Sequence, residues 1–139
     1  MDRESLVART GAVCHLARAI QRSLAQAVTF KPESFSAHLA EVADLVHMLQ
    51  KIETVLPETP YLAQAAFLSV RLECLGSTLT VLEELLADIE NSAQVKDNRF
   101  NLNRSKRRRK EDEVKRAMLR MREQTAALTL ALSANIMYV

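Results

Sequence analysis

Glycine and proline are scarce and tryptophan is absent: the 139-residue sequence contains two glycines, three prolines and no tryptophan. With so few helix breakers, and with Ala, Leu, Glu, Arg and Gln abundant, the local preferences favour helix almost everywhere, and we expect no strands. Because 48% of the residues are hydrophobic and only 4% aromatic, aliphatic side chains must fill the core, as is typical of helical bundles. The length suits one domain that buries its own core without disulfides or metals.

Cysteine is scarce as well. Cys14 and Cys74 lie far apart within apolar helical patterns and lack the paired spacing of a secreted, disulfide-rich domain, so we predict that both are reduced and buried. Residues 1–30 have no signal-peptide core, and no run of about eighteen apolar residues occurs. We therefore expect a soluble intracellular protein, cytoplasmic or membrane-associated, with the nucleus as the alternative location.

Four amphipathic stripes, with apolar residues at steps of three and four, predict four helices. The predicted helices cover residues 5–29, 34–56, 60–90 and 106–137, with Ser34 and Thr59 as the N-caps of the second and third. Residues 91–105 are rich in Asn and Ser and are predicted to form a loop. Gly76, in the middle of the third helix, indicates a close helix contact or a kink, and the contact is favoured. The predicted fold is therefore all-α, an antiparallel bundle of four main helices in a single domain over residues 1–139.

The motifs of catalysis and cofactor binding are missing from the sequence. The three histidines and two cysteines fall at none of the spacings that close a zinc site. No phosphate-binding glycine loop, dinucleotide fingerprint, nucleophile elbow or HExxH helix is present. Glu83, Glu84, Asp88 and Glu90 lie mostly off the apolar stripe, which favours a solvated acidic face over acid–base or di-metal chemistry. We expect no catalytic, cofactor or metal site, and a non-enzymatic protein that acts by binding.

Charge is distributed unevenly along the chain, although the net charge is only +2. The sums are +3 for residues 1–32, −8 for 33–90, +7 for 91–110 and zero for 111–139. The positive segment contains a basic run at the end of the predicted loop: Arg104, Lys106, Arg107, Arg108, Arg109 and Lys110.

This basic run fits several roles. It can bind phosphate or an acidic lipid head group, serve as a nuclear import signal, or be a solvated segment neutralised within the chain, in part by Glu111, Asp112 and Glu113. Nucleic acid is less favoured, because no stacking aromatics are interleaved with the charges. We expect an anionic partner, with an external one slightly favoured over the acidic middle of the same chain.

The first predicted helix also allows two interpretations. Its apolar stripe is bordered by arginines, a pattern that suits a helix lying on a membrane surface but occurs more often in a helix facing a bundle core. We predict that Leu6, Ile20 and Leu24 on this stripe take part, together with the basic run, in contacts with a protein partner, a second copy of the chain or a membrane.

Three segments in order resemble the HeLo-like N-terminal domain of fungal STAND and NLR-like proteins. Phe35–Leu56 is similar to that family's second helix, Leu72–Leu86 to its cysteine-bearing third helix, and Met121–Ser133, after the basic run, to its closing helix. The resemblance implies a helical signalling module of regulated cell death or self/non-self recognition that assembles into oligomers, acts at membranes and has no enzymatic activity, cofactor or small-molecule substrate.

The sequence departs from this family at two places. The family's first helix is close to continuously apolar, whereas charged residues interrupt this one, which argues against its insertion into a membrane. The family often has tryptophan before the basic stretch, and here Phe100 stands nearest. A nuclear or nucleic-acid-associated adaptor that uses residues 104–110 is the alternative function.

Overall fold

The computed structural model describes residues 3–59, 66–94 and 100–137. Within these ranges all regular secondary structure is helical, and no strand is present. The helices are α1 (Arg3–Phe30), α2 (Pro32–Val55), α4 (Ala66–Gln94) and α5 (Phe100–Met137), and a short 3₁₀ turn, η1 (Leu56–Glu58), follows α2.

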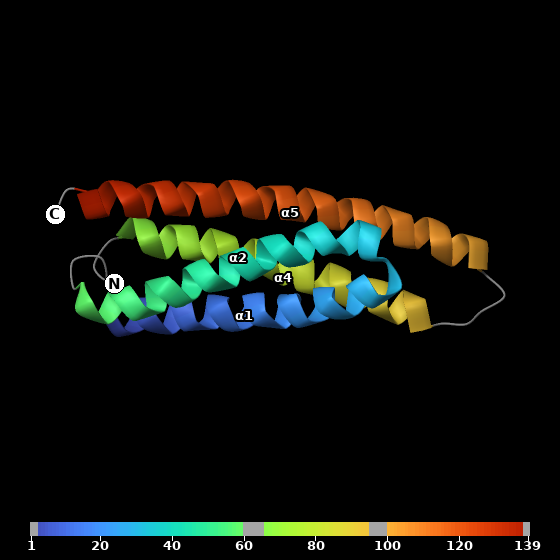
Figure 1. The fold of residues 1–139 in the computed structure, drawn as a ribbon, viewed down its shortest axis with the longest axis horizontal. Helices are drawn as coiled ribbons and strands as arrows, with labels where there is room; N and C mark the ends of the chain where they lie inside the picture. Colours follow the sequence, from blue (N-terminus) through green and yellow to red (C-terminus); the bar gives the residue numbers. More distant parts are fainter. Residues whose placement is uncertain (1–2, 60–65, 95–99, 138–139) are drawn as a thin grey trace.

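The four helices lie along one long axis, and consecutive helices run in opposite directions (Figure 1). Two antiparallel hairpins result, because α1 packs on α2 and α4 packs on α5. The hairpins join through α1 and α4, which run in the same direction, whereas contacts between α2 and α5 are sparse. The prediction of an all-α antiparallel bundle of four helices is therefore confirmed.

The core consists of the apolar stripes that the sequence predicts. Its largest fully buried side chains are Leu6, Ile20, Leu24, Leu45, Leu49, Leu56, Leu68, Leu72, Leu75, Leu79, Leu82 and Met118. Helix α4 supplies many of them because it touches both α1 and α5, which requires a wide apolar face. Helix α5 adds Val114, Met121 and Leu128 along one side.

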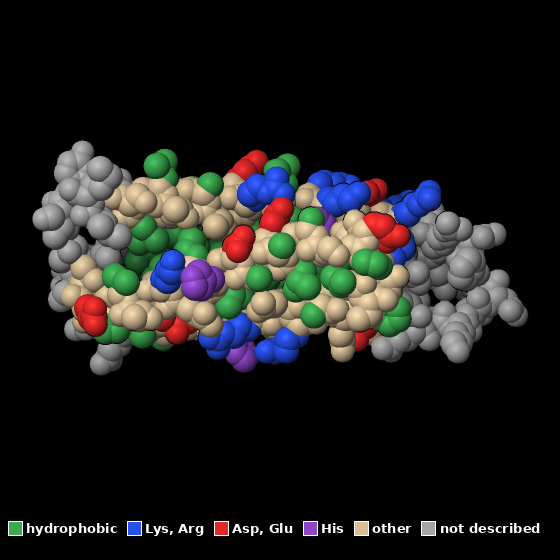
Figure 2. All heavy atoms as spheres, in the orientation of Figure 1, with side chains coloured by type: hydrophobic (Ala, Val, Ile, Leu, Met, Phe, Trp, Pro, Cys, Tyr) green, Lys and Arg blue, Asp and Glu red, His purple; other side chains and the backbone are tan. Residues whose placement is uncertain are grey.

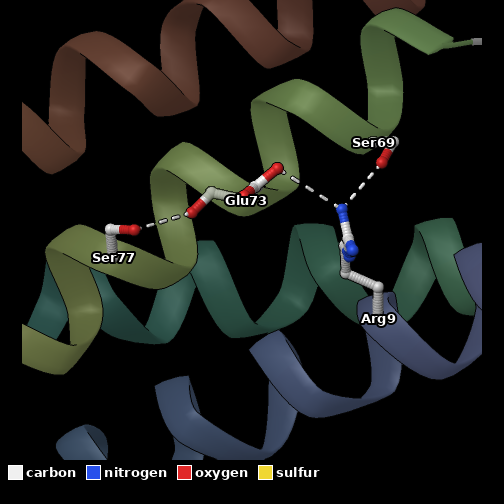
Figure 3. A network of polar contacts seen from close by, with 4 residues as sticks. All are labelled: Arg9, Ser69, Glu73 and Ser77. Carbon is white, nitrogen blue, oxygen red and sulfur yellow. Dashed lines mark hydrogen bonds and ion pairs between the residues drawn. The ribbon is translucent and has the colours of Figure 1, made fainter.

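Gly76 lies where α4 packs against α1, opposite Val13. A Cβ atom placed on Gly76 would lie 3.5 Å from Cγ2 of Val13, an ordinary van der Waals distance. Nearby, the Arg9 guanidinium donates a hydrogen bond to Ser69 Oγ at 2.8 Å and lies 3.6 Å from the Glu73 carboxylate (Figure 3). Arg9 therefore links α1 to α4 through two side chains of α4.

The boundary between α1 and α2 is tighter than predicted. Helix α1 ends at Phe30 and α2 begins at Pro32, so Lys31 alone connects them. Lys31 is the N-cap residue and makes no side-chain cap hydrogen bond, and Ser34 lies inside the helix. The predicted cap at Ser34 is wrong, because proline at the first helical position already has the helical φ and needs no donor there.

The predicted loop at 91–105 is also wrong over most of its length. Helix α4 continues to Gln94 and α5 begins at Phe100, leaving only residues 95–99 outside the description. No glycine or proline occurs after residue 76, and Asn and Ser each cost a helix only about 0.7 kcal/mol or less relative to alanine. Flanking residues that favour helix outweigh that cost, so α5 takes in the basic run.

The predicted boundary at Thr59 is tested only on one side. The Thr59 hydroxyl donates a hydrogen bond to the Val55 carbonyl oxygen at 2.6 Å, which closes the end of the α2–η1 segment. Residues 60–65, where the third helix was predicted to begin, lie outside the described residues.

Candidate functional site

The described part of the chain offers little for chemistry. In those ranges no group of three or more His, Cys, Asp or Glu side chains could hold a metal ion. Cys14 is buried beside Glu53, and both the burial and the carboxylate raise the pKa of its thiol, which keeps the thiol protonated and unreactive. Cys74 is free and exposed, so the prediction that both cysteines are buried is wrong for Cys74.

The predicted contact residues of the first helix lie in the core. Leu6, Ile20 and Leu24 are each 0% exposed and pack with the other buried residues of the bundle. The closed bundle therefore does not present them to a partner or a membrane, and the interpretation of α1 as a core-facing helix is the one that the structure supports. Among the helices in the described ranges, none is long and apolar enough to cross a membrane.

The basic run lies in the first part of α5. The side chains of Arg104, Lys106 and Arg107 fall outside the description, while Arg108 and Arg109 are exposed. Among the members whose side chains the structure describes, Lys110 pairs within the chain: its Nζ lies 3.3 Å from Asp88 Oδ2 on α4 and 4.0 Å from Glu113 Oε2. At Lys110, therefore, a carboxylate from the acidic segment 33–90 does neutralise a charge of the basic run.

The acidic turn after the run contributes less neutralisation than the sequence suggests. Glu111 points to the junction between α1 and α2, where its Oε1 accepts a hydrogen bond from Lys31 Nζ at 3.0 Å. Asp112 is exposed. Asp112 follows Arg108 by four residues and precedes Lys115 by three, so helical geometry puts it on the same side of α5 as these cations. No ion pair joins it to another side chain that the structure describes.

Helix α5 extends the basic run into a longer basic face. Lys115, Arg116 and Arg120 are exposed, and they follow Arg108 and Arg109 at the spacings of one side of a helix. We call these five residues the basic face of α5: Arg108, Arg109, Lys115, Arg116 and Arg120. None of them forms an ion pair with another side chain that the structure describes. Figure 2 shows Lys and Arg side chains gathered over this half of α5.

The continuation of the basic face beyond Lys110 is a feature that the sequence analysis missed. A signal for it exists, because Arg108 and Lys115 are seven residues apart, as are Arg109 and Arg116. Seven residues make almost two helical turns, so each pair shares a side of the helix. The predicted loop up to residue 105 concealed this by placing the run at the start of a helix instead of within one.

A groove separates α2 from α5 along the C-terminal half of each helix. One part has a volume of about 440 Å³ and another of about 250 Å³, and Met48 lines both. Apolar side chains form much of its lining: Leu45, Met48, Ile52, Val55, Leu56, Leu68, Met121, Ala126 and Leu132. Polar and charged side chains also line it: Glu41, Asp44, Lys51, Arg122, Thr125 and Thr129. Figure 2 shows hydrophobic side chains at the bottom of a hollow between the two helices. We call this the α2–α5 groove.

Polar contacts bridge α2 and α5 where apolar packing is thin. Arg122 donates a hydrogen bond to Glu41, and the Thr129 hydroxyl lies 3.2 Å from the sulfur of Met48. The buried atoms His38 Nδ1, Glu41 Oε2 and Thr125 Oγ1 have no hydrogen-bond partner among the described residues. Leaving a buried polar atom unpaired costs about 1–3 kcal/mol, so these atoms reduce the stability that the contact between α2 and α5 provides.

His38 at this seam has a perturbed pKa. Burial lowers the pKa of the imidazole, and the charges of Lys115 and Arg122 lower it further, while Glu41 opposes them. The ring packs edge-on against Phe35, with centroids 6.3 Å apart. His38 is therefore a neutral side chain near pH 7.

Comparison with known proteins adds no further guide: no family model, curated protein or solved structure matches the chain. The basic face of α5 and the α2–α5 groove are the two surfaces from which a function can be inferred.

Proposed function

We propose that this protein is a non-enzymatic helical signalling module that binds an anionic membrane surface through the basic face of α5. The observation that carries the proposal is the set of five exposed cations on one side of one helix, without ion pairs to other described side chains. Like charges held this close repel one another, and an external anionic surface removes that cost. The internal acidic partner reaches only Lys110 among the described residues of the run.

The shape of the face suits a membrane. Residues 108–120 span about 18 Å of a helix at 1.5 Å per residue, so their side chains can reach a flat surface together. Leu119 lies between these cations and is 51% exposed, and an apolar side chain among cations is typical of helices that lie at a lipid interface. Each cation near an anionic lipid surface contributes about 1 kcal/mol.

The architecture supports membership of the HeLo-like group as a proposal. The resemblance implies a four-helix bundle. It also implies a basic stretch before the segment Met121–Ser133, and Arg108 and Arg109 are exposed in that stretch. Helix α1 differs in role, because its apolar stripe is fully used in the core. In our proposal α5, not α1, makes the first contact with the membrane.

Nucleic acid is the alternative anionic partner. The same face could lie along a phosphate backbone, since phosphate contacts need only cations at suitable spacing. No aromatic side chain accompanies the five cations to stack on bases. The membrane is therefore the better match.

Vesicle flotation of two matched variants tests the proposal. Replacing Arg109, Arg116 and Arg120 by glutamine removes three charges from the basic face and should weaken binding to phosphatidylserine vesicles by about 3 kcal/mol, roughly 100-fold. Replacing the exposed Arg18, Arg22 and Arg71 on α1 and α4 by glutamine removes the same number of charges outside the basic face. This control variant should keep most of its binding to the vesicles. Equal losses in both variants would mean that net charge, not the basic face, drives binding.

A further inference from the structure

We infer that uptake of a proton by His38 opens the α2–α5 seam, the contact between these two helices, while the α1–α2 and α4–α5 hairpins stay closed. The seam is suited to local opening because α2 packs mainly on α1 and α5 mainly on α4, whereas α2 and α5 touch each other only sparsely. Each helix therefore keeps its principal partner when the seam opens. Local opening at sparse contacts costs less free energy than unfolding of the whole domain.

His38 occupies a position in the seam that suits a neutral ring. Its imidazole packs edge-on against Phe35, and its Nδ1 atom is buried without a hydrogen-bond partner among the described residues. A neutral ring in this position lacks one hydrogen bond. An imidazolium donates from both ring nitrogens, so a protonated His38 would hold a buried N–H without an acceptor and would also carry a buried charge.

The surroundings of His38 in the closed seam also oppose the proton. Burial is the largest of the effects that lower the pKa of His38, and it is reinforced by Lys115 and Arg122 on α5, while Glu41 on α2 attracts the proton. The attraction by Glu41 is shared, because Glu41 Oε1 already accepts a hydrogen bond from Arg122. A protonated His38 would therefore add a third positive charge to a seam that contains two.

The direction of the pH effect follows from the linkage between proton binding and opening. In an open seam His38 is in water, and its pKa returns toward the ordinary value of 6.5, which lies above the pKa in the closed seam. The open state therefore binds the proton more tightly, and lowering the pH shifts the equilibrium toward it. At higher pH neither state holds the proton, and the seam stays closed.

Opening would change the surface of the bundle at the α2–α5 groove. Leu45 on α2 and Met121 on α5 line this groove, and both are buried in the closed structure. Separation of the two helices exposes these side chains, so an acidic environment uncovers an apolar surface that the bundle covers at neutral pH. This change lies within the chain and goes beyond the proposed function, because it needs no membrane.

Distance measurements between two spin labels test the opening. Asp44→Cys on α2 and Ala126→Cys on α5 place the labels on opposite walls of the α2–α5 groove, in a Cys74→Ser background that leaves only the buried Cys14. Double electron–electron resonance at about pH 7.5 and about pH 5.5 compares the two protonation states of histidine, above the pH at which most carboxylates titrate. We expect a second population with a longer distance at the lower pH.

Matched controls assign the effect to the seam and to His38. Labels at the exposed positions Ala25 on α1 and Ala40 on α2 report on the α1–α2 hairpin, and their distance should not change with pH. His38→Gln should abolish the longer distance between the groove labels. His47→Gln, at an exposed position of the same helix, should retain it.

A second pair of variants tests the inference without altering the buried ring. Lys115→Gln removes a cation that repels protonated His38, so opening should require a lower pH. Arg116→Gln removes the same charge from the neighbouring exposed position and should leave the pH of opening in place. Equal pH values of opening in these two variants would contradict the inference.

Two results of the distance measurements would overturn the inference directly. One is a distance between the groove labels that stays unchanged down to about pH 5.5, or that lengthens equally in His38→Gln. The other is a shorter distance at low pH, which would show that protonated His38 pairs with Glu41 and tightens the seam. Because the assay contains no lipid, its outcome is independent of whether the basic face of α5 binds vesicles.

Discussion

Replacing Gly76 by alanine should stabilise the bundle, although this glycine sits at the contact between α1 and α4. Glycine in a helix interior costs about 1 kcal/mol relative to alanine, because it loses more backbone freedom on folding. The added methyl group would meet Val13 Cγ2 at 3.5 Å, which is a normal contact that requires no movement. Part of the methyl is also removed from water, which adds a few tenths of a kcal/mol at about 0.8 kcal/mol per buried carbon.

The expected gain in the free energy of unfolding is therefore about 1–1.5 kcal/mol, which corresponds to a rise in Tm of about 3–5 °C for a domain of this size. Gly11→Ala is the matched variant, because nothing lies within 4 Å of a Cβ atom placed there, and it should gain about 1 kcal/mol from the backbone term alone. Thermal and urea unfolding followed by circular dichroism measure both. A loss of stability in Gly76→Ala beside a gain in Gly11→Ala would show that α1 and α4 approach more closely than this account requires.

Three further predictions concern the core and the α2–α5 seam. Leu79→Asp should destabilise the bundle by about 4 kcal/mol or more, because Leu79 is fully buried and the carboxylate would have no partner. An unchanged Tm would show that the buried face of α4 is wrongly assigned. A double-mutant cycle of Glu41→Gln and Arg122→Gln should give a coupling of about 1 kcal/mol or less, since Arg122 is mostly exposed. A coupling of several kcal/mol would contradict this screening by solvent. Because the pKa of His38 is lowered in the folded state, the unfolded chain takes up the proton first, so stability should fall as the pH drops below about 6.5. His38→Gln should reduce this slope in urea titrations at several pH values, and an unchanged slope would assign the pH dependence to other groups.

Hydrophobic periodicity was sufficient to predict the helices and most of the core. The stripe through Leu72, Leu79 and Leu86 lies in the core along α4, because a helix of this length has no other way to bury so many leucines. The same pattern could not predict that a single residue, Lys31, separates the end of α1 from the start of α2. That depends on Pro32, which begins a helix as readily as it ends one.

The functional surfaces were harder to predict for a different reason. The groove exists because α2 and α5 stay apart while each packs firmly on a neighbour, and no local sequence pattern encodes the distance between two helices far apart in the chain. The basic face could have been found from the seven-residue spacing of its arginines and Lys115. The Asn and Ser residues at 91–105 predict a loop and so hide the basic face, although their helix propensities are only slightly unfavourable and the segment has no glycine or proline.

Binding of the wild-type chain to phosphatidylserine vesicles, measured beside duplex DNA at about 0.15 M salt, tests the central claim most directly. We expect binding to the anionic vesicles that weakens as salt rises, no binding to neutral vesicles, and no more than weak binding to DNA. A chain that ignores anionic vesicles even at low salt, or that binds DNA more tightly than vesicles at 0.15 M, would contradict it.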